Sequence, residues 1–160
     1  MYQLERLSIT DPIVSQELRD LQTVAYKVEA YLIGFHGIPH IGQSHEALLA
    51  SPADFYGCRL QGRLAGAIAL EQESPGEITI DRLVVHPDFF RKGIGRFMLL
   101  KALEMNPNAD HLVSTGTLNA PAIQLYTAAG FTETSRLEVA PGVELTFFKR
   151  PADLPPPNGQ

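Results

Sequence analysis

The fold is decided by one stretch near the middle of the chain: Leu83-Val84-Val85-His86-Pro87-Asp88-Phe89-Phe90-Arg91-Lys92-Gly93-Ile94-Gly95-Arg96. Its apolar start predicts the end of a strand, and the apolar residues after it predict a helix that runs through Met105. A helix start presents unpaired amides and the positive end of the helix dipole, and glycine lets an anion approach the backbone. The order strand, glycine-bearing loop, helix therefore predicts a cradle for phosphate groups.

The charges around this stretch favour the same interpretation. Five basic residues and one acidic residue, Asp88, lie between positions 82 and 101; the basic ones are Arg82, Arg91, Lys92, Arg96 and Lys101. Because the whole chain carries a net charge of −5, this local positive excess predicts a bound anion. The stretch is neither a P-loop, since no Gly-Lys-Ser/Thr follows, nor a complete dinucleotide motif, since Met98 replaces the third glycine.

The strand that leads into the cradle, expected over Glu77–Val85, has an irregular pattern. Apolar residues alternate but change parity halfway, at Ile78 and Ile80 and then at Leu83 and Val85. An extra residue at Asp81-Arg82 would cause this slip, and such a bulge splays strands and leaves amides unpaired for a ligand. The alternative is a fully buried strand end in which Val84 blurs the pattern.

The rest of the chain predicts one domain over residues 1–150. Helices are expected from Asp11-Pro12 to Gly34, from Ser44 to Ala50 and from Asn119 to Gly130, and further strands over Tyr2–Ile9, Phe55–Leu60, 64–70, 111–117, 131–139 and 143–148. In the first helix, one apolar stripe is expected from Leu18, Leu21, Ala25, Val28 and Leu32. Residues 151–160 hold four prolines, so we expect a disordered tail.

Composition excludes several classes of protein. With 160 residues, 44% of them hydrophobic, the chain is long enough for one ordinary core. The net charge of −5 disfavours nucleic acid and anionic membranes as partners. Cys58 is the only cysteine, so no internal disulfide forms, and no apolar run approaches the roughly 20 residues of a spanning helix. Met1–Thr10 does not read as a signal peptide, and we expect a soluble, cytoplasmic protein.

The chain resembles the GNAT superfamily of acetyl-CoA-dependent N-acetyltransferases in two motifs. One is the stretch quoted above, and the other is Asn119-x-x-Ala122-x-x-Leu125-Tyr126-x-x-x-Gly130-Phe131. The resemblance implies an α/β (α+β) fold with a mixed, splayed central sheet of about seven strands and about four flanking helices. The cosubstrate, acetyl-CoA, would enter between two parallel central strands. Phe90 departs from the family pattern, which has Gln or Arg at this place.

The resemblance also implies roles for individual residues. Backbone groups of Leu83, Val84 and Val85 would bind the pantetheine arm and polarise the thioester carbonyl. The pyrophosphate would lie on the amides of Arg91, Lys92, Gly93, Ile94, Gly95 and Arg96. Tyr126 would protonate the departing thiolate, and Asn119 would face the pantetheine or the end of the neighbouring strand. The plainer alternatives are that Tyr126 only packs in the core and that Asn119 only caps a helix.

The attacking nucleophile must be a neutral amine, so a base or a water chain has to remove a proton. Three carboxylates, Glu71, Glu77 and Asp81, lie on strands that line the acceptor side, and Asp81 is selected as the base. Three histidines, His36, His40 and His45, crowd a loop of the acceptor pocket, where their irregular spacing predicts no metal site. We interpret Cys58 as a buried inert thiol, which disfavours a covalent mechanism.

These observations predict an enzyme that moves an acetyl group from acetyl-CoA to a primary amine by direct attack in a ternary complex. The acceptor would be a small molecule or a peptide, and by analogy with the family we expect a homodimer. The alternative is a non-catalytic acyl-CoA sensor or scaffold. An open path to the thiol beside Tyr126 would favour the enzyme, and a blocked acceptor cleft would favour the sensor.

Overall fold

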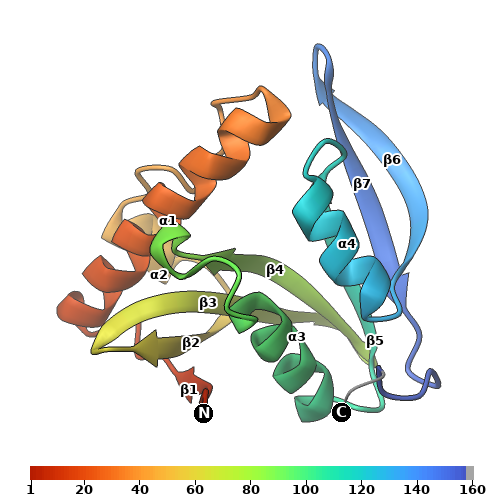
Figure 1. Ribbon diagram of the computed structural model, residues 1–160, viewed down its shortest axis with the longest axis horizontal. Helices are drawn as coiled ribbons and strands as arrows, with labels where there is room; N and C mark the ends of the chain where they lie inside the picture. The colour runs from red at the N-terminus through yellow and green to blue at the C-terminus, as the bar shows by residue number, and fades with distance from the viewer. Residues whose placement is uncertain (158–160) are drawn as a thin grey trace.

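The computed structural model describes residues 1–157, which form one seven-stranded sheet with helices on both faces (Figure 1). The sheet order is β1-β2-β3-β4-β5-β7-β6. Its strands are β1 (Glu5–Arg6), β2 (Asp54–Leu60), β3 (Arg63–Ser74), β4 (Glu77–Val85), β5 (Asp110–Gly116), β6 (Thr132–Ala140) and β7 (Val143–Arg150). The helices are α1 (Pro12–Ile33), α2 (His45–Leu49), α3 (Ile94–Met105), α4 (Ala120–Ala128) and a short 3-10 turn, η1 (Pro87–Phe89). The predicted mixed α+β class is confirmed.

The sheet is splayed at its centre. β4 and β5 run parallel, and only three residue pairs join them: Glu77 with Asp110, Ile78 with His111 and Thr79 with Leu112. Beyond these pairs the two strands diverge, and the sheet separates into a β1–β4 half and a β5-β7-β6 half (Figure 1). The predicted splay is therefore confirmed, and it leaves the carboxyl-terminal ends of β4 and β5 facing a gap.

The irregular pattern of β4 reflects a β-bulge. Ala69 of β3 pairs with Arg82, but the next residue, Leu70, pairs with Ile80, so Asp81 is the extra residue. The bulge interpretation is confirmed and the buried strand end is excluded. Because side chains alternate across a strand, the extra residue puts Leu83 on the same face of the sheet as Ile80.

The two faces of the sheet hold separate cores. One lies under α3 and α4 and includes Met98, Leu99 and Phe131. The other lies under α1 and α2 and includes Leu18 and Phe55. Each half of the chain thus packs its own helices on the sheet, and Figure 1 shows α1 and α4 on either side of the splay.

Helix α1 begins and ends as predicted. The Asp11 side chain accepts a hydrogen bond from the Ile13 amide at 2.9 Å, and Gly34 ends the helix with a φ of 69°. The residues of the expected apolar stripe have two kinds of surroundings. Its first members, Leu18 and Leu21, are in the core, whereas its later members, Ala25, Val28 and Leu32, line a cleft.

Residues near both ends of the described chain make contacts with distant segments. The first strand covers only Glu5–Arg6, not the predicted Tyr2–Ile9, and the Tyr2 hydroxyl donates to the carbonyl of Lys92. After β7, the Ala152 amide donates to Asp110 Oδ1 at 2.8 Å, and Arg150 Nη2 donates to the Pro155 carbonyl at 2.6 Å. The boundary at residue 150 and the disordered tail stay predictions, and positions 158–160 lie outside the described residues.

Candidate functional site

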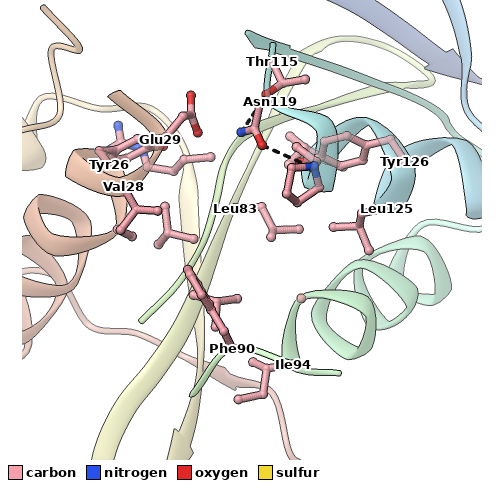
Figure 2. Close-up of a pocket in the computed structure, with 18 of the residues that line it drawn as sticks. Tyr26, Val28, Glu29, Leu83, Phe90, Ile94, Thr115, Asn119, Leu125 and Tyr126 are labelled. Carbon is pink, nitrogen blue, oxygen red and sulfur yellow. Dashed lines mark hydrogen bonds between the residues drawn. The ribbon is translucent and has the colours of Figure 1, made fainter. Parts of the chain in front are cut away.

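A cleft of about 490 Å³ opens where β4 and β5 separate (Figure 2). One side, which we name the helix wall, is formed by five residues of α1: Ala25, Tyr26, Val28, Glu29 and Leu32. Another side, the loop wall, is formed by Phe90, Arg91, Gly93, Ile94 and Gly95 at the start of α3. The ends of β4 and β5 form the floor, and α4 contributes Asn119 and Tyr126. The volume lies within the range of small-molecule sites.

The loop wall presents backbone N–H groups. Arg91 and Gly93 have positive φ angles of 63° and 75°, and Gly93 is the N-cap of α3 without any side-chain cap. Among residues 1–157, no acceptor is bonded to the amides of positions 91–95. Successive unpaired amides at a helix start, together with the helix dipole, make a site for an anion.

The open edge of β4 is a second source of unpaired backbone groups. The His86 amide donates to the Ala65 carbonyl of β3 at 2.8 Å, so alternation along the strand directs the backbone groups of Val84 to β3 as well. Those of Leu83 and Val85 point the other way, toward β5, whose pairing with β4 has already ended at Thr79. Of the three residues predicted to bind pantetheine, Leu83 and Val85 thus have backbone groups on the open edge, whereas those of Val84 belong to the ladder; the binding role of all three stays a prediction.

The basic residues do not all gather at the loop wall. Arg91 lines the cleft, and Lys92 and Arg96 are exposed beside it. Arg82 instead lies on the α1 face, 6% exposed, because the bulge turns it there. Lys101 is exposed on α3, with its Nζ 3.8 Å from Glu104 Oε2. The positive charge near the amides is thus smaller than the sequence count indicated.

Arg82 sits in a polar network under α1. Its Nε lies 2.7 Å from Asp81 Oδ2, and its Nη1 donates to Gln22 Oε1 at 2.8 Å and to Gln43 Oε1 at 3.0 Å. The guanidinium also stacks over Phe55, 5.0 Å from the ring centroid. A buried guanidinium needs such partners, so Arg82 joins β4, α1 and the loop before α2.

Tyr126 packs in the core and also lines the cleft. Its side chain is 4% exposed and packs against Phe131 and Phe148, with ring centroids 5.5 and 6.3 Å away. It also lines the cleft, and no residue among 1–157 forms a hydrogen bond with its hydroxyl. Burial, together with the nearby charge of Glu29, raises the pKa of the phenol, so it is protonated at neutral pH.

Asn119 is a helix cap that also faces the cleft. Its Oδ1 accepts from the Ala122 amide at 3.3 Å, which confirms the cap, and its Nδ2 donates to Thr115 Oγ1 at 3.4 Å. Figure 2 shows Asn119 opposite Glu29 across the cleft. Any role of Asn119 in binding pantetheine stays a prediction.

Of the three carboxylates considered as the base, the structure brings only Asp81 to the cleft. Glu77 accepts from Ser74 Oγ at 2.9 Å and lies 3.9 Å from Lys149, at the closed end of the splay. Glu71 is on β3 and does not line the cleft. One oxygen of Asp81 is engaged by Arg82, as described above, and its role as the base stays a prediction.

The sequence analysis missed one acidic residue of the cleft, Glu29. It is half-buried on the helix wall, and burial raises the pKa of its carboxyl while the side chain of Asn119 partly offsets this. The signal in the sequence was its position inside the apolar stripe: Ala25 is four residues before it and Leu32 is three residues after it. A glutamate there shares the face of its apolar neighbours.

The three histidines do not converge. His45 Nδ1 shares a hydrogen bond of 2.6 Å with Ser15 Oγ, and His40 packs on Tyr26 with a ring distance of 5.3 Å. Within residues 1–157, no group of three or more histidine, cysteine or acidic side chains is arranged to hold a metal ion. Cys58 is fully buried, and burial raises the pKa of its thiol. In the same part of the chain, no helix is both long and apolar enough to cross a membrane.

Comparison with protein families supplies the observation that decides the assignment. A model of the acetyltransferase (GNAT) domain matches residues 51–133, which include the bulged strand, the loop wall, α3 and α4. The chain belongs to the GNAT family. UPF0157 protein YqkA of Bacillus subtilis (strain 168) is 39% identical over 146 residues, which are 91% of this chain and 42% of YqkA. The GNAT chain described here thus spans less than half the length of that relative.

Solved structures with the same fold support this placement. The ribosomal-protein-S18-alanine N-acetyltransferase of Escherichia coli has a TM-score of 0.72 at 20% identity, with 100% of this chain and 99% of that chain covered. The PaiA N-acetyltransferase of Thermoplasma acidophilum, solved in complex with coenzyme A, has a TM-score of 0.75 at 18% identity, with 94% and 99% covered. At these identities the likeness establishes the GNAT fold.

Proposed function

We propose that this GNAT domain transfers an acetyl group from acetyl-CoA to a primary amine by direct attack in a ternary complex. The observation that carries the proposal is the cleft, because unpaired amides at one wall and a buried phenol at α4 open into the same space. An anionic cosubstrate and a leaving group that needs a proton both fit this arrangement.

The residues present suit acetyl-CoA as a substrate. The amides of positions 91–95 would receive its pyrophosphate, with Arg91, Lys92 and Arg96 nearby. The unpaired groups of Leu83 and Val85 would hold the pantetheine arm as an added strand and polarise the thioester carbonyl. Tyr126 would donate its proton to the sulfur as the bond between carbon and sulfur breaks.

The open cleft favours an enzyme over an acyl-CoA sensor. A sensor needs only the loop wall, whereas this cleft continues past Tyr126 to the helix wall, where an acceptor has room. A peptide amine is one acceptor class, in line with the S18-alanine acetyltransferase that shares the fold. The base assigned to Asp81, the homodimer and the cytoplasmic location remain predictions of the sequence.

The test is a thiol-release assay with the purified chain, acetyl-CoA and a panel of amines. We expect free thiol to appear only when an amine is present, and mass spectrometry to find the acetyl group on that amine. Binding of acetyl-CoA without turnover on any amine would support the sensor instead. The absence of both binding and turnover would exclude both functions for this chain.

A further inference from the structure

Glu29 lies in an environment that an ionised carboxylate does not favour. Its neighbours on the helix wall are the apolar side chains of Ala25, Val28 and Leu32, together with Tyr26. Among residues 1–157, no lysine, arginine or histidine forms an ion pair with Glu29, and burial raises the pKa of its carboxyl. A buried carboxylate without a cation is costly. A positively charged ligand would supply the missing partner.

The position of Glu29 relative to Tyr126 tells where that ligand would lie. Glu29 faces Asn119, the N-cap of α4, across the cleft (Figure 2). Its negative charge contributes to the raised pKa of the phenols of both Tyr26 and Tyr126. The loop wall and its unpaired amides lie on another side of the same cleft. A cation bound at Glu29 would therefore be near the group that protonates the thiolate and away from the phosphate site.

We propose that Glu29 binds the ammonium group of the acceptor and takes up the proton that it loses, and that the acceptor is a primary amine on an apolar chain. This inference rests on the proposed acetyl transfer. The apolar chain would lie along Val28 and Leu32, which are part of the same wall. A carboxylate next to the amine, as in an α-amino acid, would be repelled by Glu29.

The proton balance of the transfer is as follows. One ammonium proton moves to the Glu29 carboxylate, and the neutral nitrogen then forms a bond to the acetyl carbon while the carbon–sulfur bond breaks. Tyr126 gives its proton to the thiolate, and the second proton lost by the nitrogen restores the phenol. Glu29 then releases its proton to solvent. The products are the amide, the thiol and one proton.

The other charged and titratable groups near Glu29 distinguish it from Asp81. Tyr26 is on its own helix, Tyr126 is on α4, Arg91 is on the loop wall, and Asp81 and Arg82 are on β4. Asp81 already has a cation, since Arg82 Nε is 2.7 Å from its Oδ2. Arg82 in turn holds Gln22 and Gln43. Glu29 is thus the acidic residue of the cleft that, among residues 1–157, has Asn119 as a side-chain partner but no cation.

A binding experiment tests the ammonium site without turnover. The protein is loaded with CoA, and its melting temperature is measured with n-pentylamine, norleucine or 1-pentanol. Norleucine is n-pentylamine with a carboxylate beside the nitrogen, and 1-pentanol lacks the charge. We expect only n-pentylamine to stabilise the wild type, and Glu29→Gln to abolish its effect. Asp20→Asn, which removes an exposed carboxylate from the same helix, should keep it. A shift that survives in Glu29→Gln, or no shift in the wild type, would overturn the proposal.

A kinetic experiment tests the proton transfer. With n-pentylamine, Glu29→Gln should lower kcat/KM by about 100-fold, as loss of a general base does. Methoxyamine is neutral at pH 7, so its kcat/KM should fall by no more than about threefold in the variant. In the wild type, kcat/KM should rise with pH through a pKa above the ordinary carboxyl range, and this rise should disappear in Glu29→Gln.

Two outcomes of the kinetic experiment are informative in the other direction. If Asp81→Asn removes the rise of kcat/KM with pH and Glu29→Gln leaves it, the assignment to Glu29 is wrong. If the wild type binds n-pentylamine but transfers to no amine, the proposed function fails while the ammonium site stands.

Discussion

The two walls of the cleft present different kinds of chemical groups to a ligand. The loop wall offers the unpaired main-chain amides of positions 91–95, whose directions depend on the positive φ angles at Arg91 and Gly93. The helix wall offers side chains of α1, with one carboxylate among apolar groups. A site made of backbone groups depends on local conformation, whereas a site made of side chains depends on which residues a distant helix happens to carry.

This difference suggests which wall suits a ligand shared by a whole family and which suits a ligand specific to one protein. Backbone amides bind any diphosphate of the right shape, so the loop wall fits a cosubstrate common to a family. Side chains on α1 can change without altering the sheet, since Val28, Glu29 and Leu32 do not belong to either core. We therefore expect the choice of acceptor to depend on the helix wall and the binding of the cosubstrate on the loop wall, and the variants below test the two walls and Tyr126 of α4 separately.

The largest effect is expected at Gly93. Gly93→Asp places a carboxylate at a positive φ of 75°, next to the amides that would hold the pyrophosphate. We expect acetyl-CoA affinity, measured by calorimetry, to fall by at least about 100-fold, through repulsion and lost amide contacts. Gly62→Asp is the matched control, because Gly62 has a φ of 76° in an exposed turn with nothing near its Cβ position. Equal losses in both variants would mean that backbone strain, not the cradle, is responsible.

The next effect concerns Tyr126, the proposed acid that protonates the departing thiolate. Tyr126→Phe should lower kcat by about 10- to 100-fold, near the low end of general acid catalysis, and leave acetyl-CoA affinity unchanged. Its melting temperature should hold, because the hydroxyl has no hydrogen bond within residues 1–157. Tyr31→Phe, on an 81% exposed side chain, is the control. An unchanged kcat in Tyr126→Phe would leave this residue with its packing role alone.

The sequence predicted the loop wall because its signals are local. The change of parity at Asp81 is visible in the spacing of four apolar residues within the same strand, and the register of β4 confirms it. The helix start is likewise marked by two glycines, Gly93 and Gly95, one residue apart. Glu29 could not be found in this way, because its place in the cleft depends on where α1 passes the splayed strands and brings it to Asn119, ninety residues later. Likewise, the sequence analysis listed Arg82 among the basic residues around the cradle, but the bulge places its side chain on the α1 face of the sheet.

A smaller effect on the loop wall should come from Tyr2. Its hydroxyl donates to the Lys92 carbonyl, and its ring packs on Phe97 at 5.6 Å. In a trans peptide the N–H points opposite to the C=O, so this contact orients the Gly93 amide away from Tyr2. Tyr2→Phe should weaken acetyl-CoA binding by about three- to tenfold, the value of one hydrogen bond, without changing kcat. A change in kcat with unaltered affinity would contradict this positioning role.

The smallest effect is a gain of stability on the helix wall. Burial raises the pKa of Glu29 in the folded protein, so its ionisation opposes folding: the protein loses stability as pH rises from the ordinary carboxyl pKa through the raised one. Glu29→Gln removes this penalty, and its melting temperature at pH 8 should exceed that of the wild type by about 1–3 °C. At pH 4 the difference should shrink, because the carboxyl is then largely protonated whether folded or unfolded. Asp20→Asn should show no such pH-dependent gain, since Asp20 is exposed. A Glu29→Gln variant less stable than the wild type at pH 8 would mean that, in the free protein, the ionised carboxylate gains more from its surroundings, Asn119 included, than it loses by burial.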